Sequence, residues 1–353
     1  MIRSNTRGSS PRWRRSHAAM ASAALAATAA ALTAAPASAT TYVPLLSGDR
    51  IGVQDAAAPG LDTGSIRNTT AQALTGFGGL KLRVSGSTLT AKEKTFNGEL
   101  MRGFGLQYDG YDRFRTTKAV PLGGVSTSRS IRVNRDANWF RYFDSFTNTT
   151  SHVVTAEVVF GGQTGWNTAI TTGAGGTNNT QVVDTTDGDT LVETSDTWVE
   201  VASAATKAGP SAFGPSAVVV GSPTVGFGAS SNFLRDSFNQ TIATSGHEGN
   251  FTGYKNTFTL QPGETKSLLR YVVTGISETR ALSTGAAIPA AGTQITQVAT
   301  DAGTLAGAPV VDDLTAAQKC STVNWTPASL GGALNCALVT PLDPDVARQV
   351  IEP

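Results

Sequence analysis

Short apolar runs separated by turn-forming Gly, Pro, Asn and Asp dominate the chain from Thr40 to about Gly275. The same region is rich in Thr, Val, Gly, Asn and Ser, and it shows no long helical periodicity. This pattern is typical of an all-β protein. The runs predict strands at Gly79–Val84, Glu99–Tyr108, Ser128–Val133, Trp139–Thr147, Val153–Phe160, Thr190–Glu193, Trp198–Ser203, Ala217–Val220, Phe251–Leu260 and Lys266–Thr274.

Two of these runs also indicate how the strands are covered. Residues 154–160 alternate between apolar and mostly polar side chains, which predicts a sandwich strand with one buried and one wet face. Residues 139–143, Trp-Phe-Arg-Tyr-Phe, place aromatic side chains on both faces. We therefore expect a central strand covered on both sides, with its aromatic residues in the core.

Turn chemistry connects the strongest strands. Asn148-Thr149-Thr150 predicts a turn after the aromatic strand. In Gln261-Pro262-Gly263-Glu264, proline presets the second position and glycine supplies the positive φ of a type II turn. That turn predicts either a hairpin or a corner between two sheets.

The chain becomes alanine-rich after Ser277. Ile295, Val298 and Leu305 predict an amphipathic helix over residues 293–305, and a second short helix is expected to begin at Asp313 or Thr315. Cys320 and Cys336 lie 16 positions apart around a glycine pair, and we expect them to form a disulfide.

These patterns together predict an antiparallel β-sandwich over residues 40–280, followed by a small helical, disulfide-clipped segment over residues 281–353. The chain has enough residues for one large sandwich, including a supersandwich, or for two smaller ones, and length does not decide between them.

The first 39 residues predict an export signal. They contain five arginines, an apolar run from Ala18 to Ala35 and the small residues Ala37-Ser38-Ala39. We expect cleavage after Ala39, by the general or the twin-arginine export route, and a secreted protein without a lipid or membrane anchor. The remaining chain has 22 basic and 26 acidic residues and no basic cluster along the sequence, which argues against a nucleic-acid partner.

The order of the two turns supports a resemblance. Asn148-Thr149-Thr150, followed by Leu260-Gln261-Pro262-Gly263-Glu264-Thr265 before a final apolar strand, resembles bacterial secreted β-sandwich modules of the immunoglobulin-like kind over about residues 130–275. The layout is also similar to half of the supersandwich of mutarotase-like and sugar-processing proteins. The first resemblance implies a structural or adhesive role and the second implies carbohydrate contact; neither carries over a catalytic residue.

Motifs for catalysis and for metals are scarce. The sequence has no G-x-S-x-G, H-E-x-x-H, C-x-x-C or phosphate-binding G-x-x-x-x-G-K pattern, and His152 and His247 are the only histidines after the signal. We predict no catalytic residue and no cofactor. The acidic turn containing Asp184, Asp187 and Asp189 is the only candidate for calcium, but it lacks the EF-hand pattern and is better explained as a solvated hairpin tip.

The best candidate ligand site is the segment with Tyr108, Asp109, Tyr111, Asp112 and Arg113. Aromatic rings can stack on sugar faces while carboxylate and guanidinium groups hold hydroxyls. A second candidate is the glycine-flanked pair His247 and Glu248. A polar turn pinned by Asp–Arg pairs is the simpler explanation of the first segment, and an ordinary loop is the simpler explanation of the second.

The sequence therefore favours a secreted, non-catalytic β-sandwich protein that binds a surface glycan, a cell-wall polymer or a protein partner. The alternatives are a carbohydrate-active enzyme that uses Asp109 and Asp112, with His247 as a further candidate, and an accessory subunit of a secreted hydrolase.

Overall fold

A computed structural model describes residues 40–45, 50–55, 62–68, 74, 76–86, 97–110, 112–163, 180–203, 215–221, 225–228, 251–275, 290–331 and 334–340. Residues 39–353 form one compact unit. The predicted signal, residues 1–39, lies outside the described residues.

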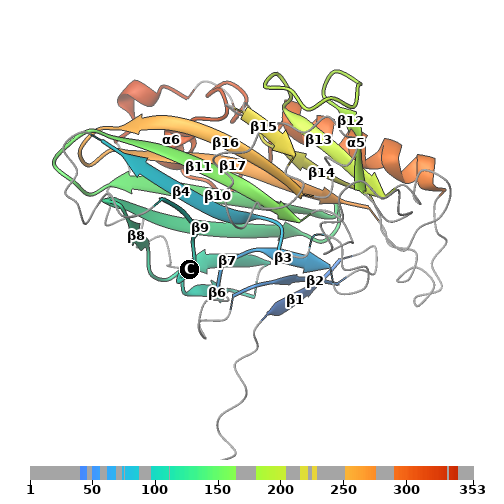
Figure 1. Ribbon diagram of the computed structural model, residues 1–353, viewed down its shortest axis with the longest axis horizontal. Helices are drawn as coiled ribbons and strands as arrows, with labels where there is room; N and C mark the ends of the chain where they lie inside the picture. Colours follow the sequence, from blue (N-terminus) through green and yellow to red (C-terminus); the bar gives the residue numbers. More distant parts are fainter. Residues whose placement is uncertain are drawn as a thin grey trace, which may run out of the picture. The chain divides into compact units, whose positions relative to one another are not determined.

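Antiparallel strands make up most of the structure, and the largest sheet has nine of them (Figure 1). Eight lie in the order β12-β13-β14-β17-β10-β9-β7-β6, and β8 pairs with β9. Their bounds are β6 Leu106–Tyr108, β7 Arg113–Thr116, β8 Val120–Leu122, β9 Val125–Asn134, β10 Trp139–Asn148, β12 Thr180–Thr185, β13 Trp198–Ser203, β14 Ser216–Val219 and β17 Thr265–Thr274. Every residue of β10 is buried, which confirms the predicted central strand.

Two smaller sheets complete the β structure. The five-stranded sheet has the order β15-β16-β11-β4-β5, with β4 Gly79–Ser85, β5 Asn97–Leu100, β11 Val154–Gln163, β15 Val225–Gly228 and β16 Phe251–Leu260. The three-stranded sheet contains β1 Thr41–Pro44, β2 Arg50–Val53 and β3 Ile66–Asn68. One hydrophobic core contains side chains from all three sheets, so the predicted antiparallel β-sandwich is confirmed.

The two predicted turns are corners between sheets. β10 and β17 belong to the nine-stranded sheet, whereas β11 and β16, which adjoin them in sequence, belong to the five-stranded sheet. The Asn148 N–H donates to the Glu264 carbonyl at 3.0 Å, and the Gly263 N–H donates to the Asn148 carbonyl at 3.0 Å. The Asn148 side-chain amide also donates to the Leu260 carbonyl at 3.1 Å. Each corner therefore holds the other, and Gly263 has the predicted positive φ of 74°.

Two strand predictions were wrong. Glu99–Tyr108 is not one strand, because Gly103 and Gly105 both adopt positive φ and donate their N–H groups to the Asp62 carboxylate at 2.8 and 3.1 Å. The break lets β5 join one sheet and β6 another. Residues 190–193 lie in the irregular connection after β12, where the Leu191 N–H donates to Asp189. Side-chain capping of that backbone replaces strand pairing there.

The main core encloses an ionic cluster. The Arg129 guanidinium donates to both oxygens of Asp144 at 2.7 and 3.0 Å, and Arg270 approaches the same carboxylate at 3.5 Å. All three side chains have no exposed surface. Arg129 also donates to the Thr63 and Gly78 carbonyls, and Arg270 donates to Asn256 of β16. The cluster thereby joins the nine-stranded sheet to β16 and to the segments around β3 and β4.

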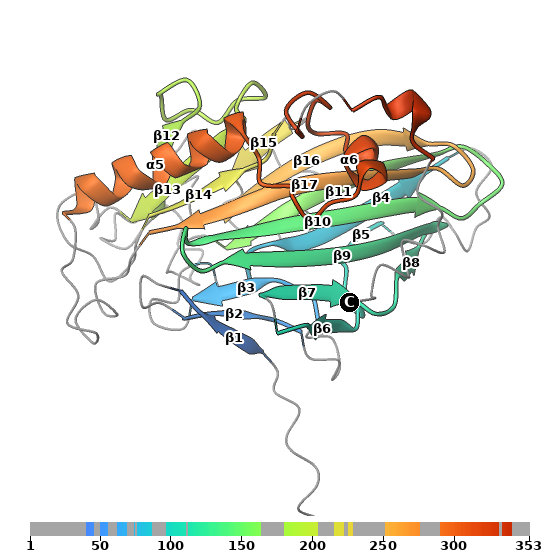
Figure 2. The ribbon, with the colours of Figure 1, turned by 180° about the vertical axis from the view of Figure 1, so that it is seen from behind.

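A second core lies on the other face of the nine-stranded sheet, under the C-terminal segment. Helix α5 (Ala291–Gly307) contacts β13, β14 and β17, and α6 (Ala316–Ser321) contacts β17 (Figure 2). The Cys320–Cys336 disulfide joins α6 to the short helix η2 (Cys336–Leu338), as predicted. Among the described residues, no helix is long and apolar enough to cross a membrane.

Glu200 of β13 is a buried carboxyl group under this segment. It alternates with Val199 and Val201 of the main core and so lies on the α5 side of the sheet. Its side chain has no hydrogen-bond partner among the described residues. Burial, together with the nearby charge of Asp184, raises the pKa of Glu200 to about 9.

Replacing Asp144 tests the ionic cluster. Asp144→Asn leaves the guanidinium groups of Arg129 and Arg270 buried without a carboxylate, and we expect the free energy of unfolding to fall by roughly 3–5 kcal/mol. Urea unfolding followed by tryptophan fluorescence measures the change. Asp136→Asn, in the exposed turn after β9, is the control and should change stability by less than about 0.5 kcal/mol. Equal effects of the two substitutions would contradict the structural role of the cluster.

Glu200 makes stability depend on pH. Below the ordinary glutamate pKa the carboxyl is neutral in both the folded and unfolded states, and its contribution is fully present. As pH rises from about 4.5 to about 9, ionisation favours the unfolded chain and that contribution is lost. Over this interval the free energy of unfolding should fall in the wild type by at least about 2 kcal/mol more than in Glu200→Gln, which urea titrations at several pH values measure. Parallel pH profiles would show that Glu200 is solvated or paired.

Candidate functional site

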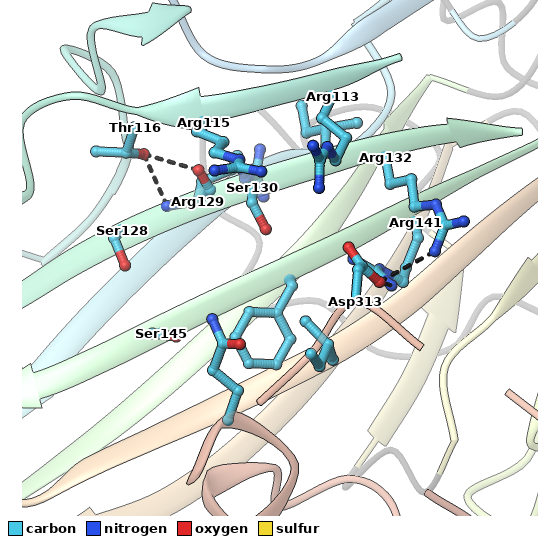
Figure 3. Close-up of a pocket in the computed structure, with 14 residues that line it drawn as sticks. Arg113, Arg115, Thr116, Ser128, Arg129, Ser130, Arg132, Arg141, Ser145 and Asp313 are labelled. Carbon is cyan, nitrogen blue, oxygen red and sulfur yellow. Dashed lines mark hydrogen bonds and ion pairs between the residues drawn. The ribbon is translucent and has the colours of Figure 1, made fainter. Parts of the chain in front are cut away.

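A groove lies on the outer face of the nine-stranded sheet, between β7, β9, β10 and the C-terminal segment (Figure 3). Its empty volume, including the part open to solvent, is about 780 Å³. The lining combines arginines, hydroxyl groups and a few apolar side chains. These residues are Arg113, Arg115, Thr116, Ser128, Arg129, Ser130, Ile131, Arg132, Arg141, Phe143, Ser145, Asp313, Leu314 and Gln318.

Strand register assembles the groove in rows. Arg113 of β7 is opposite Arg132 of β9, which is opposite Arg141 of β10. We call these three residues the arginine row. The next row is Arg115, Ser130 and Phe143, and a third contains Ser128 and Ser145. Because residues two apart in a strand share a face, the three rows lie side by side on one surface.

Carboxylates flank the arginine row from two sides. Asp109 lies 2.9 Å from Nε of Arg113 and 3.5 Å from Nη2 of Arg115. On the other side, Arg132 pairs with Asp312 and Asp313. Nη2 of Arg141 donates to Asp313 at 2.7 Å, and its Nη1 donates to the Val310 carbonyl at 3.1 Å. The acidic side chains therefore fix the arginines in place.

Asp313 has a strongly altered acidity. Burial alone would raise its pKa, but the hydrogen bonds and charge of Arg141 and the charge of Arg132 outweigh burial and lower the pKa to about 2. Asp313 is therefore ionised throughout the neutral range, and it binds Arg141 through both carboxylate oxygens.

Several donors in the groove have no protein partner among the described residues. Arg113 uses only its Nε, so that Nη1 and Nη2 remain available. Arg132 uses only its Nη1. The Ser128 and Ser130 hydroxyls and the Gln318 side-chain NH₂ group likewise make no hydrogen bond there. The groove thus presents guanidinium, hydroxyl and amide groups above an apolar floor that includes Phe143 and Leu314.

The predicted ligand segment is divided between two sites. Arg113 lines the groove, and Asp109 supports it by ion pairing. Tyr108 and Asp112 belong instead to a separate cluster, where the Tyr108 hydroxyl donates to Asp112 at 2.9 Å and Arg135 pairs with Asp112. Burial and the Asp112 hydrogen bond raise the pKa of Tyr108. Tyr111, His247 and Glu248 lie outside the described residues.

Sequence reasoning missed most of the groove. Ser128, Ser130 and Arg132 lie on β9, Arg141 lies on β10 and Gln318 lies on α6; strand register aligns the first four, and the packing of α6 on β17 adds the last. The local signal was the alternation in β9, whose intermediate positions Ser128, Ser130 and Arg132 share one face. That alternation shows which residues of β9 share a face, but it does not show which strands lie beside β9.

A metal centre does not emerge from the described residues, which contain no group of three or more His, Cys, Asp or Glu side chains placed to hold an ion. In the acidic turn that was considered for calcium and interpreted as a hairpin tip, the Thr185 hydroxyl donates to Asp187 at 2.8 Å and to Asp189 at 3.1 Å. Asp187 and Asp189 are exposed, whereas Asp184 is half-buried.

No protein-family profile and no curated protein matches the chain. Among solved structures, a polysaccharide lyase is similar over 68% of this chain and 32% of its own, at 12% identity and a TM-score of 0.31. A putative aldose 1-epimerase from Escherichia coli K12 is similar over 67% of this chain and 99% of its own, at 10% identity and a TM-score of 0.33. Heparinase III is similar over 68% and 36% of the two chains, at 10% identity and a TM-score of 0.31. The chain spans about a third of the lyase and of heparinase III.

Asp313→Asn tests the C-terminal wall of the groove. At pH 7 the substitution should lower the free energy of unfolding by about 2 kcal/mol, because the ionised carboxylate is preferred by the folded state. The contribution of Asp313 is present above the ordinary aspartate pKa and is lost as pH falls through about 2. Urea unfolding between about pH 2 and pH 7 measures it. A difference between wild type and variant that does not shrink at low pH would contradict the ion pair.

Proposed function

We propose that the chain is a secreted, non-catalytic β-sandwich protein that binds a glycan of a cell surface or cell wall in the groove. The observation that carries the proposal is the cluster of unengaged donors in one concave surface, from Arg113, Arg132, Ser128, Ser130 and Gln318. Sugars offer hydroxyl oxygens to such donors and apolar ring faces to a floor of the kind formed by Phe143 and Leu314.

The carboxylates around the groove support binding rather than hydrolysis. Glycoside hydrolysis ordinarily needs two carboxyl groups that flank the scissile bond. Asp313 is the one carboxylate in the groove lining, and it is held by Arg141. Asp109 and Asp112, the pair considered from the sequence, bind different arginines, and neither lines the groove.

The test is retention of the purified protein on an array of cell-wall and surface glycans, with release of reducing sugar measured on the same polymers. We expect retention without release. Ser128→Ala combined with Ser130→Ala removes two hydroxyl donors and should weaken binding at least about fivefold, since each hydrogen bond contributes about 1 kcal/mol.

The matched control is Ser85→Ala, at an exposed end of β4 in the five-stranded sheet, which should leave retention unchanged. Release of reducing sugar that is lost in Asp109→Asn would favour the enzyme alternative. Retention on no polymer would overturn the proposed function and leave a protein partner as the better explanation.

A further inference from the structure

The arginine row places three guanidinium groups on adjacent strands. Arg113 and Arg132 are direct partners across β7 and β9, and Arg132 and Arg141 are direct partners across β9 and β10. Like charges directly opposite one another destabilise a sheet. An ordinary sandwich has no need for this arrangement, so the row requires either internal counter-charges or a ligand that supplies them.

The internal counter-charges lie mostly outside the groove lining. Four arginines face the groove, and Asp313 is the one carboxylate among the described residues of its lining; Arg129 also borders the groove, but its guanidinium points into the core. Asp144 balances Arg129 from the core side of the sheet, Asp109 pairs with Arg113 and Arg115, and Asp312 is a largely exposed partner of Arg132. The outward arginines thus exceed the carboxylates that pair with them by one charge, and the unengaged N–H groups among the described residues are concentrated on Arg113 and Arg132.

This charge is local to the groove. Without the predicted signal, the chain has 22 basic and 26 acidic residues, so that its net charge is slightly negative. General attraction of the protein for polyanions is consequently weak, and a preference for an acidic ligand would have to arise from the groove itself.

The free nitrogens of the row also have suitable geometry. Arg113 presents both Nη atoms of its guanidinium fork, which match the two oxygens of a carboxylate or two oxygens of a sulfate. Arg132 presents Nε and Nη2 from the neighbouring strand. Figure 3 shows the side chains of these two residues in the same part of the groove, beside the Arg141–Asp313 pair. Ser128, Ser130 and Gln318 remain for the neutral hydroxyls of a sugar.

We infer that the groove selects acidic glycans, with the anionic group seated between Arg113 and Arg132. The inference rests on the proposed function and specifies the class of glycan. Asp313 holds Arg141 at the end of the row, so the anion binds at the end where the guanidinium nitrogens are unengaged.

Two matched pairs of polymers test the inference. Polygalacturonate is compared with its methyl ester, and dextran sulfate is compared with dextran, so that each pair differs in charge on a shared backbone. Affinity is measured by titration of the wild type and of Arg113→Gln. We expect the wild type to bind the acidic member of at least one pair at least about tenfold more tightly than the neutral member. Arg113→Gln should lower the affinity for that acidic polymer about tenfold and the affinity for its neutral partner less than about twofold. The pair that responds distinguishes a carboxylate from a sulfate.

Three further variants complete the test. Arg113→Lys keeps the charge without the fork and should bind with intermediate affinity. Arg132→Gln, on the neighbouring strand, should lower the affinity for the acidic polymer to the same extent as Arg113→Gln. Arg83→Gln is the control, because Arg83 is similarly exposed and ion-paired but lies on β4 of the five-stranded sheet. Thermal unfolding verifies that each variant is folded. If Arg113→Gln is unfolded, Arg132→Gln takes its place in the test.

The outcomes separate the two proposals. Equal binding of charged and neutral polymers would overturn the inference while leaving glycan binding intact. Loss of acidic binding to the same extent in Arg83→Gln would overturn the assignment to the groove. If the protein bound none of the four polymers and no glycan on the array, the proposed function itself would be overturned.

Discussion

The carboxylate of Asp144 is the group on which the packing of the nine-stranded sheet against the five-stranded sheet depends. It lies in the dry core and receives two hydrogen bonds from Arg129 and an ion pair from Arg270. Two cations and one anion leave an excess positive charge, and aromatic ring faces help to stabilise it: the Phe160 ring lies 4.8 Å from the Arg270 guanidinium, and the Tyr142 ring lies 4.9 Å from that of Arg129. Burial nevertheless lowers the pKa of Arg270 to about 9. Such a cluster is stable only when all its partners are in place, so it specifies one alignment of β9, β10 and β17.

Arginines on the two faces of the same strands have different roles. Arg129 faces inward from β9 and has no exposed surface, whereas Arg132 faces outward and keeps about a quarter of its side chain exposed. The inward arginine is saturated by Asp144 and by backbone carbonyls. The outward arginine retains unengaged nitrogens among the described residues. On β9, therefore, the arginine with full pairing helps to hold the sheets together, and the one with incomplete pairing at a wet surface is the one to which we assign ligand binding.

The sequence predicted the parts of the fold that local chemistry determines. The alternation of β11, the aromatic strand β10, the turn at Pro262-Gly263, a short helix starting at Asp313 or Thr315 and the disulfide all follow from residues close together in the chain. Thr180–Thr185 was missed as a strand because its pairing with β13 includes a bulge and its sequence resembles the neighbouring polar turn. The break at Gly103 and Gly105 depends on Asp62, which is about 40 positions away in sequence. Distant partners of this kind are invisible to periodicity.

The candidate site was predicted only in part for the same reason. Arg113 could be found because a local cluster of Tyr, Asp and Arg surrounds it, whereas Arg132 and Arg141 join it only through strand register. The combination of Arg132 with Asp312 and Asp313 requires residues some 180 positions apart to meet. A pattern of residue types can therefore suggest one wall of a groove, but the opposite wall depends on the fold.

The C-terminal segment is a fixed wall of the groove, because it continues the sheet where β14 ends. β14 pairs with β17 from Thr274 only as far as Tyr271. Beyond that point the Val323 N–H donates to the Ser267 carbonyl, and the Asn324 side chain both accepts from the Leu269 N–H at 3.0 Å and donates to the Leu269 carbonyl at 2.7 Å. Asn324 is buried, so these bonds are shielded from water. They anchor α6, and with it Gln318, against the same sheet that carries the arginines. Since the wall and the arginine row are bonded to the same sheet, the proposed binding function gains a spacing of donors that is set before a ligand arrives, which reduces the entropy lost on binding.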